Sequence, residues 1–222
     1  MTNKKIILAF DMDDTLVRTG EYLHFNLRHL LKMESRPDLI AEIDELREKG
    51  YSTMNYPLHL KELIDKHFVG TGQFMLDAQP SELCSLKDIS SLRDLLQEFQ
   101  GIIIPLICTH RGFHEYGDQY TRVWIERRGL STLFGNVHCI DPQEHKDKIV
   151  YLKSLYPDDE IVLVDDNPLG KHDGVHEFRK EILLYEEENP LTAYGEMKKI
   201  KSMNCVIEHV SELVYQLKGW EA

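Results

Sequence analysis

The chain has 222 residues, 42% of them hydrophobic, and a formal net charge of −12 at pH 7. This length suits one large domain or a domain with a modest insertion, and the apolar content excludes global disorder. The acidic balance argues against a protein that coats the nucleic-acid backbone, because such binding needs a basic surface. A small nucleotide held by a few local cations is still compatible with it.

The sequence predicts neither secretion nor membrane insertion. Its N-terminal residues lead directly into an apolar run that is too short for a signal-peptide core. No stretch reaches the roughly 20 apolar residues of a membrane span. The cysteines lie far apart and form no Cys-x-x-Cys pair, which argues against structural zinc or a disulfide framework. We therefore expect a cytoplasmic protein with reduced thiols, and its oligomeric state is left open.

A short apolar run, residues 6–10, ends at a group of three carboxylates and a threonine. An apolar run of this length bounded by charge predicts a buried strand. Asp11, Asp13 and Asp14 then follow its C-terminal end, which is where ligands bind in an open parallel α/β sheet. Acids this close repel one another unless a cation is present, so the pattern favours a site for Mg²⁺. Taken alone, the same residues also suit an ordinary turn.

Between Arg18 and Phe99 the sequence shows helical periodicity and no strand pattern. Apolar residues recur at helical spacing in four stretches: 22–31, 39–46, 58–68 and 89–99. Residues 74–86 show no clear pattern. The whole stretch is much longer than one crossover between parallel strands needs. We therefore expect a helical cap at residues 18–99, whose last helix leads back to the core.

The remainder of the chain alternates strands and helices. Strands are predicted at 102–108, 137–140, 160–164 and 181–185, and a further short strand at 205–207 also fits; helices are predicted at 116–128, 148–155 and around 213–217. Pro105 cannot donate a ladder hydrogen bond, so it indicates a strand start, an edge or a bulge. The expected fold class is α/β, a Rossmann-like doubly wound parallel sheet, with residues 1–17 and 100–222 as its core and a small helical cap after the first strand.

Three predicted strands end in polar triplets, which a parallel sheet brings to one edge: Asp11-Met12-Asp13, Thr109-His110-Arg111 and Asp165-Asp166-Asn167. A lysine, either Lys146 or Lys148, precedes the last of these strands at a helix start. In this order the residues resemble the four signature motifs of the haloacid dehalogenase (HAD) superfamily of phosphatases: Asp-x-Asp-x-Thr, strand-Thr, Lys and strand-Asp-Asp. The resemblance covers residues 1–17 and 100–185, and the family often has Gly where this chain has Asp14.

The resemblance implies a Mg²⁺-dependent phosphomonoesterase with an HAD-like core. Asp11 would be the nucleophile that forms an aspartyl-phosphate, and Asp13 the general acid and base. Because an ionised Asp is a poor acid, Asp13 is expected to have a raised pKa or to share a proton in the complex. Asp166 would bind the metal together with the Asp11 carboxylate and the Asp13 carbonyl. Asp165 would be a second ligand or an outer-shell acceptor.

The remaining motif residues would hold the phosphate, and each has an alternative. Thr109 would donate to the phosphoryl oxygens, but it could also cap a helix. Lys148 would neutralise phosphate and Asp11, although Lys146 could take its place. His110 and Arg111 could contact the substrate's phosphate or leaving group, or lie in a solvated loop. The fourth motif could form only a turn.

Fold and motifs do not fix the substrate. The Asp-Asp motif combined with a helical insertion resembles 5′(3′)-deoxyribonucleotidases, and the Thr-His-Arg-Gly strand end resembles the phosphatase half of polynucleotide kinase-phosphatases. We expect a small phosphorylated substrate, with nucleotides as the leading class, no membrane partner and no extensive nucleic-acid binding. The alternatives are a nucleic-acid end-processing phosphatase and a catalytically idle HAD-fold binding protein.

Overall fold

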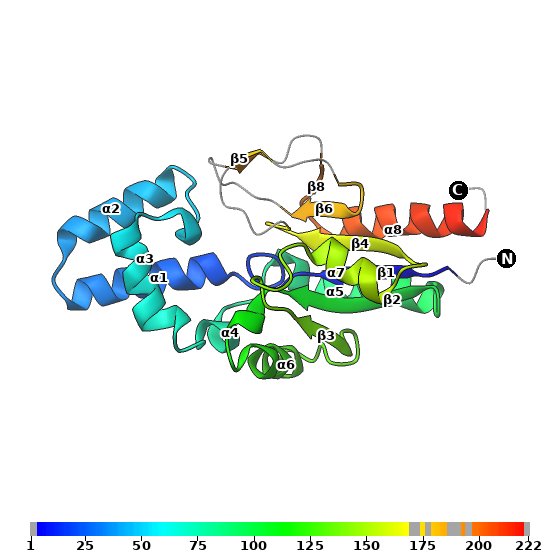
Figure 1. Ribbon diagram of the computed structural model, residues 1–222, viewed down its shortest axis with the longest axis horizontal. Coiled ribbons are helices and arrows are strands. Elements are labelled where there is room, and N and C mark those ends of the chain that lie inside the picture. Colours follow the sequence, from blue (N-terminus) through cyan, green and yellow to red (C-terminus); the bar gives the residue numbers. More distant parts are fainter. Residues whose placement is uncertain (1–3, 169–173, 176–178, 186–191, 194–196, 220–222) are drawn as a thin grey trace.

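The computed structural model describes residues 4–168, 174–175, 179–185, 192–193 and 197–219. Six parallel strands form the central sheet in the order β3-β2-β1-β4-β6-β8 (Figure 1). Their bounds are β1 (Ile6–Phe10), β2 (Ile103–Thr109), β3 (Asn136–Cys139), β4 (Glu160–Asp165), β6 (Ile182–Tyr185) and β8 (Lys198–Ile200). Two short strands, β5 (Gly174–Val175) and β7 (Thr192–Ala193), pair separately. Neither these two strands nor β8 was predicted.

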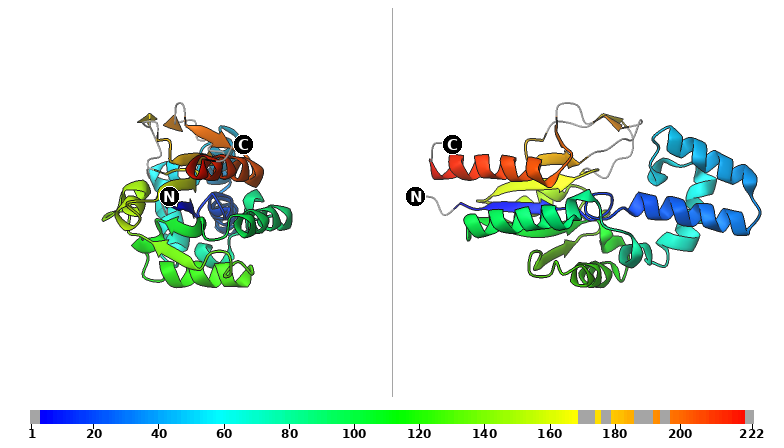
Figure 2. Two further views of the ribbon diagram at one scale, coloured as in Figure 1. Left: turned by 90° about the vertical axis from the view of Figure 1, so that its right-hand side faces the viewer. Right: turned by 180° about the vertical axis from the view of Figure 1, so that it is seen from behind.

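Helices cover both faces of the sheet (Figure 2). The α-helices are α1 (Thr19–Met33), α2 (Pro37–Glu48), α3 (Leu58–Ile64), α4 (Phe74–Asp77), α5 (Leu86–Glu98), α6 (Gly117–Arg127), α7 (Lys148–Leu155) and α8 (Met203–Lys218). Short 3-10 turns lie at Thr53–Asn55, Glu82–Cys84 and Arg111–Phe113, and a π-helical segment at Asp65–Val69 continues α3.

The alternation of side chains along β1 explains the two helical layers. Ile6, Leu8 and Phe10 point to one face and join a cluster with residues of α5, α6 and α8, whereas Ile7 and Ala9 point to the other and pack with residues of α7. Every residue of β1 is buried, as expected for the central strand of a sheet covered on both sides. The predicted α/β class with a doubly wound parallel sheet is thus confirmed.

The connection from β1 to β2 carries the helical insertion. Figure 1 shows α1, α2 and α3 set apart from the sheet; they share an apolar cluster of their own, which includes Leu27, Ile43 and Leu60. In contrast, α5 packs against α8 on the sheet face, as expected for the helix that leads back to the core. We propose that residues 18–99 form the insertion, in which residues 18–80 are the cap proper and α5 is the helix that leads back to the core.

Two details of the predicted elements need correction or explanation. Residues 205–207 do not form a strand, because Val206, Val210 and Val214 recur at helical spacing and bury one face of α8. Pro105 lies in β2 beside β1, and β3 pairs with β2 only from Leu106 onward, so the β3 side of β2 is unpaired at the proline. None of the helices in the described ranges is both long enough and apolar enough to cross a membrane.

Candidate active site

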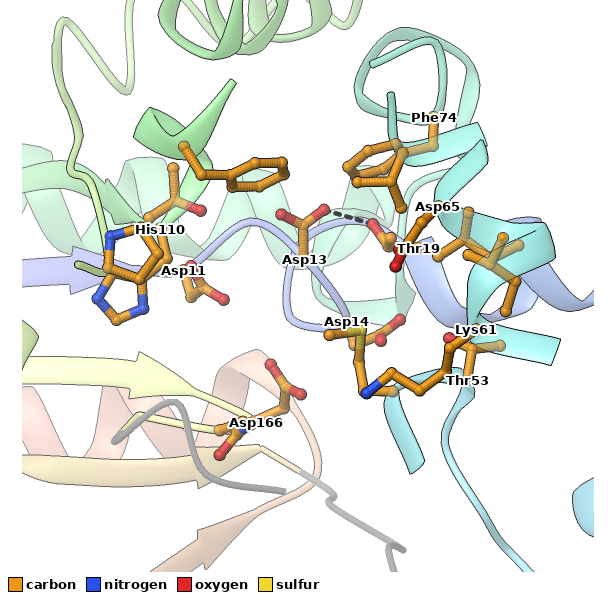
Figure 3. A pocket seen from close by; sticks show the side chains of 18 of the residues that line it. Asp11, Asp13, Asp14, Thr19, Thr53, Lys61, Asp65, Phe74, His110 and Asp166 are labelled. Carbon is orange, nitrogen blue, oxygen red and sulfur yellow. Dashed lines mark hydrogen bonds between the residues drawn. The ribbon is translucent and has the colours of Figure 1, made fainter. Parts of the chain in front are cut away.

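Three strand ends meet at one cavity, where the sheet's strand order reverses around β1. The chain leaves β1 at Asp11, β2 at Thr109 and β4 at Asp165, and the Asp11 amide donates to the carbonyl of Val164 at 2.9 Å. The cavity has a volume of about 440 Å³ and reaches from these strand ends to the helical insertion. Figure 3 shows Asp11, Asp13, His110 and Asp166 around it. An opening at this switch point is where open α/β sheets bind ligands.

Asp11, Asp165 and Asp166 form a set of oxygen donors. One carboxylate oxygen of each lies within 4.8 Å of the others. Burial raises the pKa of Asp165 to about 7, although the nearby Lys148 opposes the shift. Burial also raises the pKa of Asp166 well above its usual range, and the surrounding carboxylates add to this. Crowded acids of this kind favour a cation among them, and carboxylate oxygens fit Mg²⁺.

Lys148 contacts two of these acids, whereas Lys146 contacts neither in the described part of the chain. Its Nζ is 2.8 Å from Asp11 Oδ1 and 2.6 Å from Asp165 Oδ2, and the side chain is buried. Asp147 caps α7 by accepting from the amide of Val150 at 3.1 Å, which places Lys148 in the first turn. Burial alone would lower the pKa of Lys148, but the two carboxylates outweigh burial and raise it. Lys146 is exposed.

Thr109 and His110 line the cavity at the end of β2. Thr109 is buried and does not cap a helix, because the next helical turn begins at Arg111 with His110 before it. His110 Nε2 lies 2.8 Å from the carbonyl of His145, so this nitrogen carries the proton and donates. Burial and then the charge of Lys148 lower the pKa of His110, which keeps its ring neutral at neutral pH.

Arg111 does not lie in a solvated loop; its side chain is completely buried and forms a bidentate ion pair with Asp13. Its Nε donates to Asp13 Oδ2 at 2.8 Å, and a terminal nitrogen donates to Oδ1 at 2.7 Å. The other terminal nitrogen donates to Thr121 Oγ1 at 3.2 Å. Burial would raise the pKa of Asp13, but Arg111 outweighs burial and the pKa is lowered. The raised pKa expected for Asp13 is therefore wrong for the free site, because a bidentate guanidinium stabilises the carboxylate. The other expectation, that Asp13 shares a proton in the complex with substrate, is unaffected by this result.

Three residues of the loop after β1 and the start of α1 make hydrogen bonds at the site that were not predicted from the sequence. Thr15 Oγ1 donates to Asp166 Oδ1 and accepts from the Asp166 amide, both at 3.0 Å, so it ties the first motif to the fourth. Thr19, the first residue of α1, donates to Asp13 Oδ1. Asp14 has the left-handed φ of 55° and accepts from the Gly20 amide at 2.7 Å. Asp tolerates this conformation because its short side chain can bond locally.

Gly117 fixes the loop that presents Arg111. A Cβ at Gly117 would lie 1.9 Å from the carbonyl oxygen of Arg111, which is a severe overlap with backbone. We expect Gly117→Ala to displace the loop and to lower the free energy of unfolding by about 1–3 kcal/mol, measured by urea denaturation. Gly135→Ala is the matched control, since nothing lies within 4 Å of its added Cβ. Equal stability of both variants would contradict this account.

Comparison with known proteins shows the fold. No known family model and no curated protein matches the sequence. A predicted phosphatase from Clostridium acetobutylicum is 11% identical with a TM-score of 0.52, covering 94% of this chain and 99% of its own. A HAD-superfamily hydrolase from Geobacter sulfurreducens is 12% identical with a TM-score of 0.51, covering 94% and 97%. A HAD family hydrolase from Deinococcus radiodurans, with bound phosphate and sodium, is 13% identical with a TM-score of 0.50, covering 95% and 97%. The chain therefore has the fold of HAD-superfamily hydrolases.

Proposed function

We propose that this protein is a Mg²⁺-dependent phosphomonoesterase that hydrolyses a small phosphate ester through an aspartyl-phosphate on Asp11, with a nucleotide as the leading substrate class. One observation carries the proposal: the buried Lys148, the buried Thr109 and the carboxylates of Asp11, Asp13 and Asp166 all line one cavity of ligand size at the ends of β1, β2 and β4. The phosphate bound to the structurally similar Deinococcus hydrolase supports it.

In this proposal Asp11 attacks phosphorus and its carboxylate oxygen forms the new bond. Asp11 lies at the tip of β1, held by its backbone bond to Val164, so its approach to the phosphate is fixed. A Mg²⁺ ion held by Asp11, Asp165 and Asp166 would cancel the repulsion between an anionic nucleophile and an anionic phosphate. Lys148 contributes a second fixed positive charge beside Asp11. Thr109 lines the same cavity, where its hydroxyl can donate to a phosphoryl oxygen.

In this proposal Asp13 acts as general acid in the first half-reaction and as general base in the second. Because it is ionised in the free site, its first proton comes with the substrate: phosphate monoesters lose their second proton near pH 6, so part of the substrate is monoanionic at neutral pH. That proton is shared with Asp13 in the complex and passes to the leaving alkoxide as the ester bond breaks. The Asp13 carboxylate then accepts a proton from the water that attacks the aspartyl-phosphate, which releases inorganic phosphate and restores Asp11.

Removal of divalent metal tests the proposal. We expect p-nitrophenyl phosphate hydrolysis to be lost with EDTA and restored by Mg²⁺, and Mg²⁺ to raise the melting temperature of the wild type because it binds the folded state. Asp166→Asn should weaken both responses, since it removes the negative charge from one of the ligands. Asp158→Asn, an exposed residue in the loop before β4, is the matched control. Hydrolysis that persists in EDTA, or no hydrolysis across a broad phosphate panel with Mg²⁺, would contradict the proposal.

A further inference from the structure

The cavity wall formed by the helical insertion differs in chemistry from the acidic edge. On this side the lining is mainly apolar and aromatic: Leu23, Met54, Ile64, Val69, Phe74 and, from the loop after β2, Phe113. A leaving group that reaches from Asp13 to this wall gives up water where it contacts the apolar side chains. Apolar walls favour a flat or apolar group and disfavour a polyol, whose hydroxyls would lose hydrogen bonds to water without replacement.

Two charged side chains interrupt this apolar wall. Lys61 and Asp65 lie one helical turn apart, and both line the cavity. Figure 3 shows them extending from the insertion toward the loop that carries Asp13 and Asp14. Residues at this spacing often pair, yet in the described part of the chain neither side chain makes an ion pair or hydrogen bond. The wall therefore offers one free donor group and one free acceptor group.

The backbone at this point is also unusual. The segment Asp65–Val69 is π-helical, and the Gly70 amide donates to the carbonyl of Asp65 at 2.9 Å. π-helical turns are rare and occur frequently at functional sites. Asp65 and Val69, the two ends of this turn, both line the cavity, as does Ile64 just before it. The irregular turn thus lies in the wall that would contact a leaving group.

We propose that this wall is a base-recognition subsite, in which Lys61 and Asp65 read the hydrogen-bonding edge of the heteroaromatic base of a nucleoside monophosphate. The apolar and aromatic side chains contact the faces of the ring. Lys61 donates to a ring acceptor, and Asp65 accepts from a neighbouring N–H. A second phosphate or a carboxylate on the leaving group is disfavoured, because Asp14 and Asp65 also line the cavity. The inference rests on the proposed phosphatase function, since it names the leaving group at the same site.

The test compares substrates that share a phosphate and differ in the base. The wild type is assayed with the common nucleoside 5′- and 3′-monophosphates, with ribose 5-phosphate, which lacks a base, and with acetyl phosphate. We expect kcat/KM for the best nucleotide to exceed that for ribose 5-phosphate by about tenfold or more, the scale of base stacking. Lys61→Met should raise KM for that nucleotide about tenfold with a much smaller change in kcat. Its kcat/KM loss should be several times greater for the nucleotide than for acetyl phosphate.

Two further variants sharpen the test. Asp65→Asn turns a pure acceptor into a group that also donates, so it should change the order of preference among the bases. Lys66→Met is the matched control, because Lys66 is an exposed neighbour on the same π-helical turn and does not line the cavity. Equal kcat/KM for ribose 5-phosphate and every nucleotide, or equal losses for Lys61→Met and Lys66→Met, overturns the base-recognition subsite.

Failure of the base-recognition subsite can be distinguished from failure of the phosphatase proposal. Acetyl phosphate needs no base contact, so its hydrolysis reports the catalytic acids alone. If the wild type hydrolyses acetyl phosphate but shows no preference for nucleotides, the phosphatase proposal stands and the subsite is wrong. If the wild type hydrolyses nothing, nucleoside binding itself is measured by calorimetry with wild type and Lys61→Met. Equal affinity, or no binding by either, then overturns the subsite.

Discussion

Replacement of Asp11 by Asn is expected to abolish phosphate-ester hydrolysis, with kcat lowered on the order of 10⁴-fold or more. The amide keeps the size of the carboxylate but is no nucleophile, so no covalent phosphoryl-enzyme forms. The loss should come without unfolding. Asp11 is 6% exposed beside two further acids, and Lys148 keeps its 2.6 Å contact with Asp165 when Asp11 is neutral. Relief of the repulsion among crowded like charges offsets the loss of the Asp11–Lys148 ion pair, so we expect little change in stability.

The covalent step gives a readout that does not depend on steady-state turnover. Rapid acid quench of the wild type with a phosphate ester should show a protein species heavier by one phosphoryl group, located by mass spectrometry on the peptide that contains Asp11. Asp11→Asn should show none, whereas Asp158→Asn should behave as the wild type. A variant Asp11→Asn that retains wild-type turnover would show that another group is the nucleophile.

Replacement of Arg111 by Met is expected to damage both stability and activity. The substitution removes a fully buried cation and leaves the Asp13 carboxylate without its bidentate partner. Breaking a buried pair from one side costs about 3–5 kcal/mol, and we expect the lower end because solvent still reaches Asp13. We expect kcat to fall about 100-fold, since proton transfer by a positioned acid contributes about that much or more.

The pH dependence of stability distinguishes loss of the Arg111–Asp13 ion pair from loss of packing alone. A carboxyl group with a lowered folded-state pKa adds stability above its unfolded value near 3.8, and that contribution disappears as pH falls through the folded-state pKa. The stability gap between wild type and Arg111→Met should therefore be widest near neutral pH and narrow below about pH 4. A gap that is constant with pH would indicate packing alone.

Two controls complete the design. Arg122→Met makes the same substitution in an exposed pair with Asp118 on α6, and should cost no more than about 1 kcal/mol. In a double-mutant cycle with Asp13→Asn, Arg111→Met should show a coupling energy above about 1 kcal/mol, as residues in direct contact do. Additive effects of the two substitutions would contradict a direct energetic link.

Five of the six strands of the sheet were predictable because they carry local signals; β8 (Lys198–Ile200) was not predicted. Residues 6–10, 102–108 and 160–164 are mainly apolar runs followed by polar triplets, and the parallel ladder brings those triplets to one edge of the sheet. The helices α1 to α3 were readable for a similar reason, since each buries an apolar stripe. The β5–β7 pair could not be predicted, because two-residue strands leave no periodicity to read.

The contacts within the site were harder to foresee than its location. Arg111 and Asp13 are 98 positions apart, and no pattern in either segment indicates that one neutralises the other. The sequence left Arg111 open between a substrate contact and a solvated loop. The structure excludes the solvated loop, because the side chain is buried against Asp13. Thr19 is the first residue of α1, after the N-cap residue Arg18, and no local sequence pattern indicates its bond to Asp13. Pairings of this kind depend on tertiary packing.

The two ends of the helical insertion meet on the core. Val17 bridges to Pro80, the Arg18 amide donates to Gln79, and the Ser81 amide donates to Leu16. The chain between these residues therefore closes a loop whose entropic cost grows only logarithmically, by about 0.6 kcal/mol for each doubling in length. If the insertion selects the substrate as proposed, this selectivity can evolve independently of the core. Helices α1 to α3 can be lengthened, shortened or exchanged while the spacing of Asp11 from Thr109 across the β1–β2 ladder is preserved.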